Sequence, residues 1–183
     1  GPSRPETELE HRLVRIWQQV LDVDEVGVDD DFFELGGHSM AAERVFTEVE
    51  KLFEQRLPLA LLFDAPTIRE FANHLSDGEW KPRWSPLVPL QMDGQSPPLF
   101  LIHPIGANLL HYSDIARRLK GRRVVYGVQP TGLDGVTTPV DDLVDMARGY
   151  VDVVREAGFG APYMLGGTSF GGIVAFEMAR QLR

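Results

Sequence analysis

Two serines lie in sequence contexts that suit covalent chemistry. Ser39 follows Gly36 and Gly37 and precedes an amphipathic segment, so a turning loop would leave its hydroxyl open to another enzyme. The unpaired N–H groups at the helix N-terminus favour an attached phosphodiester. Ser169 is the centre of residues 167–171, which read Gly-Thr-Ser-Phe-Gly and match the G-x-S-x-G pattern of a nucleophilic serine. The chain therefore offers one candidate modification site and one candidate nucleophile.

The residues around Ser39 predict the elements that would position it. Downstream apolar residues recur at helical spacing and predict a helix with Ser39 at or near its N-cap. Upstream, the acidic run 29–31 closes on Phe32 and Phe33. Two simpler interpretations stay open: Ser39 is only a helix cap after a glycine turn, or the three acids are only a solvated loop. The apolar helix positions are Ala42, Val45, Phe46, Val49, Leu52 and Phe53.

Residues 30–39 read D-D-F-F-E-L-G-G-H-S and resemble the carrier-protein family, specifically the peptidyl carrier domains of nonribosomal peptide synthetases. The resemblance implies that Ser39 carries 4′-phosphopantetheine, attached by a phosphopantetheinyl transferase. It also implies condensation and adenylation domains upstream as partners. Polyketide carrier domains also carry their cofactor on a matching serine, and only the G-G-H-S sequence of residues 36–39 favours the peptidyl class.

Residues 4–78 predict a small all-α carrier bundle of about four helices. Thr7 with Glu10, and Thr67 with Glu70, have the spacing of capping boxes that open its first and last helices. The expected helices are about 8–21, one after Ser39, a short one within 58–63, and one after Thr67. A bundle of this size has a modest core, so aromatic side chains should supply much of its burial. The candidates are Trp17, Phe46, Phe53, Phe63 and Phe71.

Residues 79–97 predict a proline-rich linker with an irregular entry into a second domain. Periodicity disappears there, and the segment contains Pro82, Pro86, Pro89 and Pro97. Such a tether holds two units at an effective concentration on the order of millimolar, so a group carried by one is presented repeatedly to the other.

Residues 98–183 change period and predict a parallel sheet with crossover helices, which is part of an α/β-hydrolase fold. Short apolar runs alternate with amphipathic segments, as in βαβ units. The expected strands are 99–102, 124–128 and 163–166, and the expected helices are 109–119, 140–154 and 172–183. Ser169 then stands between a strand and a helix, where the G-x-S-x-G motif belongs.

The turn at Ser169 should aim the backbone N–H of Phe170 at a developing oxyanion. The loop that begins His103-Pro104-Ile105 resembles the H-P-x-G-G loop of the type I thioesterases that terminate nonribosomal peptide and polyketide assembly lines. The resemblance implies Ile105 N–H as the second oxyanion donor. Ala107 stands where that family usually has a second glycine. His103 itself is interpreted as a strand-end residue that packs against the loop.

The chain ends fourteen residues after Ser169, and that tail contains neither histidine nor aspartate. Without a base, a serine is a weak nucleophile. The resemblance to a thioesterase therefore covers only the N-terminal portion of that domain, and we expect the remainder, with its acid and histidine, to be supplied elsewhere.

Taken together, the chain resembles the terminal carrier–thioesterase pair of a nonribosomal peptide synthetase, and the resemblance implies a role in antibiotic or siderophore biosynthesis. A peptide held as a thioester on Ser39 would pass to Ser169 and leave by hydrolysis or macrocyclisation. The alternative is a carrier and docking module that performs no chemistry in this form. A third possibility, an unrelated serine hydrolase with a helical appendage, leaves Ser39 unexplained.

Composition excludes several other classes. The net charge of −9 over 183 residues argues against a nucleic-acid partner, and no apolar stretch is long enough to predict a membrane span. The chain has no cysteine and no histidine pair at ligand spacing, so no metal site is expected. The lack of cysteine is compatible with a cytoplasmic location.

Overall fold

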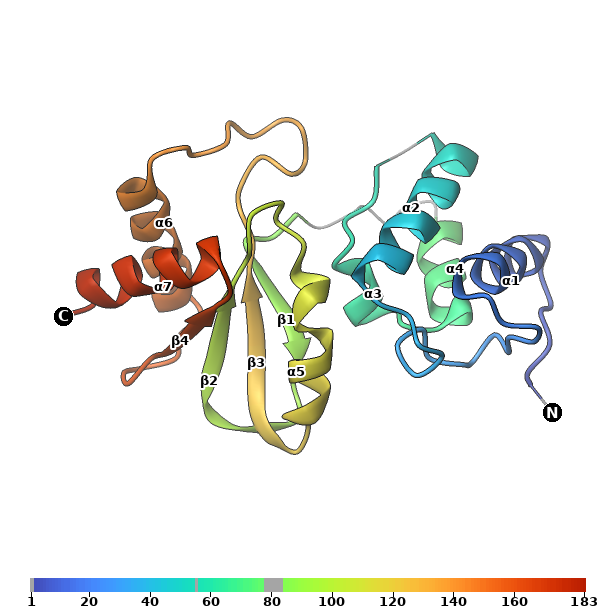
Figure 1. The fold of residues 1–183 in the computed structure, drawn as a ribbon, viewed down its shortest axis with the longest axis horizontal. Helices are drawn as coiled ribbons and strands as arrows, with labels where there is room; N and C mark the ends of the chain where they lie inside the picture. Colours follow the sequence, from blue (N-terminus) through green and yellow to red (C-terminus); the bar gives the residue numbers. More distant parts are fainter. Residues whose placement is uncertain (1, 55, 78–83) are drawn as a thin grey trace. The chain divides into compact units, whose positions relative to one another are not determined.

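The chain folds as two compact units. The computed structural model describes residues 2–54, 56–77 and 84–183 (Figure 1). The first unit ends at Arg83 and the second begins at Trp84. Residues 79–83 of the predicted linker therefore lie outside the described residues.

The first unit is helical, as predicted. Its helices are α1 (Glu8–Leu21), α2 (Ser39–Phe53), α3 (Leu61–Asp64) and α4 (Ile68–Ser76). Both predicted capping boxes are confirmed: Thr7 and Glu10 exchange side-chain and backbone hydrogen bonds at the start of α1, and Thr67 and Glu70 do so at α4. Each box satisfies helix N–H groups that would otherwise lack partners.

The core of this unit lies between α1, α2 and α4. Trp17, Phe46 and Phe71 are buried there as predicted. Leu52 and Phe53 were expected on the same buried face of α2, but they are 45% and 37% exposed. They lie in the last turn of α2 and line a surface groove together with Glu8, Leu9 and Arg12 of α1.

The second unit contains a four-stranded sheet in the order β1-β3-β2-β4. The strands are β1 (Leu87–Gln91), β2 (Gly94–Ile102), β3 (Arg122–Val128) and β4 (Met164–Gly167). The three strands expected from the sequence, now β2, β3 and β4, run parallel, whereas β1 joins the edge antiparallel to β3.

Strand β1 and the beginning of β2 occupy residues that the sequence assigned to the linker. Their prolines suggested irregular structure, because proline cannot donate to a strand ladder. In the structure Pro89 lies in β1, which is an edge strand. An edge strand can leave one side of its backbone unpaired and so tolerates proline. The linker prediction was therefore wrong for residues 87–91 and 94–97.

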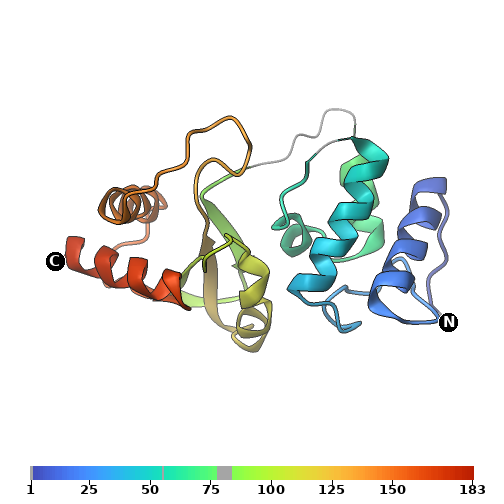
Figure 2. The same cartoon turned by 45° about the horizontal axis from the view of Figure 1, so that its top comes forward.

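Helices cover both faces of the sheet. They are the 3₁₀ helix η1 (Leu109–Tyr112), α5 (Ser113–Arg118), α6 (Leu143–Glu156) and α7 (Phe170–Gln181). Figures 1 and 2 show α6 and α7 on one side of the sheet and α5 on the other. Right-handed crossovers produce this arrangement, since the chain moves from β2 to β3 in one direction and from β3 across β2 to β4 in the other.

Two helix starts differ from the prediction. Helix α6 begins at Leu143 rather than 140, because the side chain of Asp142 accepts hydrogen bonds from the N–H groups of Val144 and Asp145 and caps it. Helix α7 begins at Phe170, directly after Ser169. The second shift matters for the site, because it places the candidate nucleophile at the helix N-cap.

Candidate functional site

Ser39 is the first residue of α2. The N-cap is His38, whose Nδ1 accepts a hydrogen bond from the N–H of Ala41 at 3.4 Å. Ser39 is partly exposed, and the following Met40 is 69% exposed. The serine therefore lies at the N-terminus of a fifteen-residue helix, accessible from solvent, while the histidine beside it does the capping.

Phe32 and Gly37 hold the loop before Ser39. Phe32 is completely buried, and its ring meets the ring of Trp17 edge-on at 5.1 Å between centroids. The N–H of Gly37 donates to the Phe32 carbonyl at 2.9 Å. A Cβ on Gly37 would overlap with that carbonyl and with the Phe32 ring. Gly37 is therefore required for a close approach to the aromatic core.

The acidic run that precedes Phe32 is structural. Asp29 pairs with Arg69 at 2.6 Å, Asp30 accepts from the N–H of Gly27 at 2.7 Å, and Asp31 accepts from the N–H of Phe33 at 2.7 Å. Each carboxylate thus anchors a different part of the loop. The interpretation of these acids as only a solvated loop is wrong.

In the second unit, Ser169 lies in a strained turn between β4 and α7. Its φ is 53° and its ψ is −125°, a region that residues other than glycine rarely adopt. The residue is exposed. A Cβ on Gly171 would overlap with the Ile102 carbonyl, and one on Gly167 would overlap with Gly171 itself. The two glycines of the motif let the strand and the helix approach closely enough to form this turn.

Tyr112 fixes this turn from the far end of η1. Its hydroxyl donates to the carbonyl of Ile102 at 2.6 Å and accepts a hydrogen bond from the N–H of Thr168 at 3.0 Å. The residue is buried. Nothing in the sequence pointed to Tyr112, since its partners lie in β2 and in the turn and only the fold brings them together.

The loop after β2 forms a tight turn. The N–H of Ala107 donates to the carbonyl of Pro104 at 3.0 Å. Gly106 has φ +89°, as the third residue of a type II turn requires. Ala107 has φ 63°, so the alanine that replaces the expected glycine adopts a left-handed conformation. Ile105, at the tip, is 77% exposed.

His103 is buried and bonded on both ring nitrogens. Nδ1 lies 2.8 Å from the Pro104 carbonyl oxygen and Nε2 lies 2.9 Å from the Tyr150 hydroxyl. Burial lowers the pKa of His103, although the hydrogen bond to Pro104 works in the opposite direction. With both nitrogens engaged, His103 is a structural residue, as its place at the strand end suggested.

The sheet register brings both loops to one edge. Ile102, the last residue of β2, is paired with Val128 of β3 and with Gly167 of β4. Parallel strands that end together release their loops at the same edge, where ligand sites of open α/β sheets form. The loop with Ile105 and the turn with Ser169 and Phe170 are therefore neighbours. Within the described part of the chain, neither the Ile105 nor the Phe170 N–H has a hydrogen-bond acceptor.

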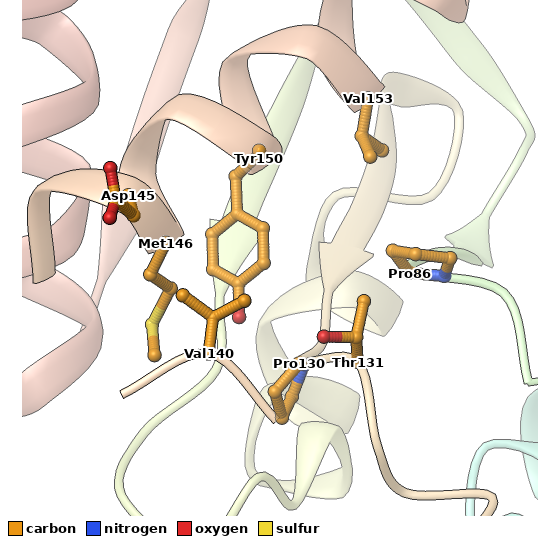
Figure 3. Close-up of a pocket in the computed structure, with 9 residues that line it drawn as sticks. Pro86, Pro130, Thr131, Val140, Asp145, Met146, Tyr150 and Val153 are labelled. Carbon is orange, nitrogen blue, oxygen red and sulfur yellow. The ribbon is translucent and has the colours of Figure 1, made fainter. Parts of the chain in front are cut away.

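A small apolar pocket lies between α6 and the segments that flank β1 and β3. Figure 3 shows Tyr150, Met146 and Val153 projecting from α6 along it, with Val140 and Pro130 opposite. Tyr150 thus lines the pocket with its ring and reaches His103 with its hydroxyl.

Two features bear on other kinds of site. In the described ranges no cluster of histidine and carboxylate side chains could hold a metal ion. Among the described helices, none combines the length and apolar character needed to cross a bilayer.

Comparison with known families divides the chain in the same way. Residues 11–75 match the family described as a phosphopantetheine attachment site, and residues 97–183 match the thioesterase domain family. The first unit is thus a carrier domain of the kind that bears covalent phosphopantetheine. The second is the N-terminal part of a hydrolase-like thioesterase domain.

Relatives join the two domains in the same order. The chain is 37% identical over 178 residues to indigoidine synthase of Dickeya dadantii, covering 97% of this chain and 12% of that protein. It is 34% identical over 183 residues to a dimodular nonribosomal peptide synthase of Bacillus subtilis, covering 100% of this chain and 8% of the relative.

A solved structure of a four-domain nonribosomal peptide synthetase bound to AMP and glycine aligns with the whole chain. The identity is 33%, the TM-score is 0.52, and the match covers 14% of that protein. The chain is therefore a carrier domain fused to part of a thioesterase domain, a fusion that it shares with these nonribosomal peptide synthetases. It spans a small share of each relative's length.

Proposed function

We propose that this chain is the terminal carrier–thioesterase pair of a nonribosomal peptide synthetase, in which Ser39 carries the phosphopantetheine and Ser169 takes over the acyl chain. The observation that carries the proposal is the backbone of Ser169, whose positive φ holds the hydroxyl exposed at the start of α7. Strain of this kind persists where the surrounding structure over-determines it, as at functional sites.

The surroundings of Ser39 suit a phosphodiester. The N-terminal N–H groups of α2 and the helix dipole favour negative charge there. The side chain is partly exposed, and Gly37 packs on Phe32 so that the preceding loop stays close to the core. Phosphopantetheine supplies a terminal thiol that holds an acyl group as a thioester.

Ser169 Oγ would attack the carbonyl carbon of the delivered thioester. A C–O bond forms and the C–S bond breaks, while the serine proton passes to a general base and the thiol sulfur is reprotonated. The N–H groups of Ile105 and Phe170 would hold the oxyanion, a type of contact worth about 3–4 kcal/mol in other enzymes. Water or a nucleophile within the peptide would then release the acyl chain from Ser169, as a linear acid or a macrocycle.

The general base of this reaction is not His103, because both of its ring nitrogens are bonded to Pro104 and Tyr150. A histidine–aspartate pair from the remainder of the thioesterase domain would fill that role. The other proposed partners are a phosphopantetheinyl transferase and the condensation and adenylation domains upstream, with a cytoplasmic location.

The intact mass of the denatured protein tests the carrier part. We expect incubation with coenzyme A and a broad-specificity phosphopantetheinyl transferase to add one phosphopantetheine to the chain and none to Ser39→Ala. Ser169→Ala is the matched control and should load normally. Absence of loading on the unsubstituted chain would refute the assignment of Ser39.

A serine-directed fluorophosphonate tests the hydrolase part. We expect labelling at Ser169, lost in Ser169→Ala and unaffected by Ser39→Ala, in the longest form of the protein that contains this chain. If that form loads at Ser39 but never labels at Ser169, the alternative of a carrier and docking module without catalysis is the correct one.

A further inference from the structure

A buried line of hydrogen bonds runs from α6 to the loop after β2. The Tyr150 hydroxyl lies 2.9 Å from Nε2 of His103, and Nδ1 of His103 lies 2.8 Å from the carbonyl oxygen of Pro104. Tyr150 and His103 are each 4% exposed. Water therefore does not substitute easily for either bond.

The hydrogen-bonding chemistry of the three groups fixes their roles. A carbonyl oxygen only accepts, so Nδ1 of His103 must carry the proton that points at Pro104. Burial lowers the pKa of His103 and keeps the ring neutral, which leaves Nε2 as an acceptor. The Tyr150 hydroxyl must then be the donor to Nε2. Tyr150 thereby reinforces the tautomer of His103 that the Pro104 carbonyl requires.

The Pro104 carbonyl accepts a second hydrogen bond, from the N–H of Ala107 at 3.0 Å. Both of its lone-pair positions are thus directed into the protein. That carbonyl and the N–H of Ile105 belong to the same peptide group, which is planar and trans. In a trans peptide group the C=O and the N–H point in opposite directions. Because the Pro104 carbonyl points inward at His103 and Ala107, the Ile105 N–H points outward.

We infer that Tyr150 is a positioning residue, which acts through His103 to hold the Pro104–Ile105 peptide group with its N–H facing outward. The inference rests on the proposed function, in which that N–H is an oxyanion donor. A donor fixed before the reaction costs no reorganisation when charge develops. Tyr150 would touch neither the acyl group nor Ser169 and would act only through the peptide group.

Removal of the Tyr150 hydroxyl isolates this role. In Tyr150→Phe the ring still lines the apolar pocket of Figure 3, but Nε2 of His103 loses its donor. The Pro104 carbonyl alone then favours the Nδ1–H tautomer, and in the fraction of molecules that take the other tautomer Nδ1 no longer donates to Pro104. Tyr126→Phe is the matched control, because Tyr126 belongs to the same core and no hydrogen bond of its hydroxyl is found among the described residues.

Nitrogen NMR of the His103 ring in the whole chain gives a readout that does not depend on activity. We expect the Nδ1–H tautomer in the unsubstituted chain and in Tyr126→Phe, and a measurable Nε2–H population in Tyr150→Phe. Amide exchange of Ala107 should become about tenfold faster in Tyr150→Phe, while core amides of β3 keep their rates. An Nε2–H tautomer in the unsubstituted chain, or an unchanged tautomer and Ala107 exchange in Tyr150→Phe, would overturn the inference.

Repeating Tyr150→Phe in a His103→Asn variant distinguishes a positioning role of Tyr150 from a general loss of stability. In His103→Asn the shorter amide can donate to Pro104 without help from Tyr150, so adding Tyr150→Phe should leave Ala107 exchange unchanged. Equal acceleration by Tyr150→Phe in both backgrounds would overturn the proposed route through His103.

Kinetics connect the tautomer to the reaction. In a form of the protein that releases its product, Tyr150→Phe should lower kcat about tenfold with little change in KM, less than the 10²–10³-fold typical of a deleted oxyanion donor. If no form labels or turns over at Ser169, the proposed function fails while the NMR result still decides the tautomer. If turnover is normal in Tyr150→Phe despite the altered tautomer, the positioning role is wrong and the proposed function stands.

Discussion

The hydroxyl of Tyr112 accepts a hydrogen bond from the N–H of Thr168 at 3.0 Å, although 56 residues separate them. The same hydroxyl donates to the carbonyl of Ile102 at 2.6 Å. One side chain thus joins the end of β2 to the turn that presents Ser169.

Tyr112→Phe should destabilise the second unit. It leaves the N–H of Thr168 and the buried carbonyl of Ile102 with one partner fewer, and the buried acceptor sets a cost of about 1–3 kcal/mol. We expect faster amide exchange at Thr168 first, and a lower urea midpoint for the second unit. Tyr163→Phe, at a half-buried tyrosine that packs against the core of the same unit, should change neither by a comparable amount.

Ser169→Gly should make the second unit more stable while abolishing acyl transfer. Glycine relieves backbone strain of about 1–3 kcal/mol, which stabilises the folded state. Its greater freedom in the unfolded chain cancels about 0.5–1 kcal/mol of that gain. We therefore expect the free energy of unfolding of the second unit to rise by about 1 kcal/mol, as measured by exchange of its core amides. Ser169→Ala keeps the Cβ and should show no gain, and an equal gain in both variants would contradict the strain argument.

Ala107→Gly should stabilise the loop after β2. A left-handed conformation costs a residue with a Cβ about 1–2 kcal/mol, which exceeds the entropy penalty of glycine by up to about 1.5 kcal/mol. The free energy of unfolding measures the difference. Ala116→Gly, within α5, should instead destabilise the same unit, because glycine is a poor helix former. A loss of stability in Ala107→Gly would show that the alanine methyl contributes packing that outweighs the strain.

Gly37→Ala should disturb the carrier unit and slow loading of Ser39. The new Cβ overlaps with Phe32, and overpacking of this kind costs about 1–3 kcal/mol. Gly36→Ala is a useful comparison, because its φ of +91° is strained but nothing lies within 4 Å of the added methyl. The rate of phosphopantetheine transfer should fall further in Gly37→Ala. Equal rates would mean that the contact with Phe32 does not control the position of Ser39.

Acid should destabilise the second unit through His103. Burial lowers its pKa in the folded state below the 6.5 of the unfolded chain. Between the two values the unfolded state binds more protons, so stability is full above pH 6.5 and declines as the pH falls below it. Core amide exchange in the second unit at pH 7.5 and about pH 5.5 measures this slope. His103→Asn should flatten it, and an unchanged slope would assign the acid sensitivity to other groups.

Much of the architecture could be predicted because local patterns specified it. The capping boxes at Thr7 and Thr67 satisfy helix N–H groups within three residues, so their effect does not depend on distant packing. The apolar runs that became β2, β3 and β4 mark buried strands for a similar reason. Strand β1 escaped prediction, since whether Pro89 fits a strand depends on its place at the sheet edge.

By itself the sequence determined where the two serines lie, which residues surround them, and that glycines would permit both turns, because these are properties of neighbouring residues. The tertiary structure alone decided what holds the turns in place. Tyr150 reaches His103 across 47 residues and Tyr112 reaches Thr168 across 56. Such contacts have no sequence period, since they depend on the register of parallel strands and the faces on which crossover helices pack.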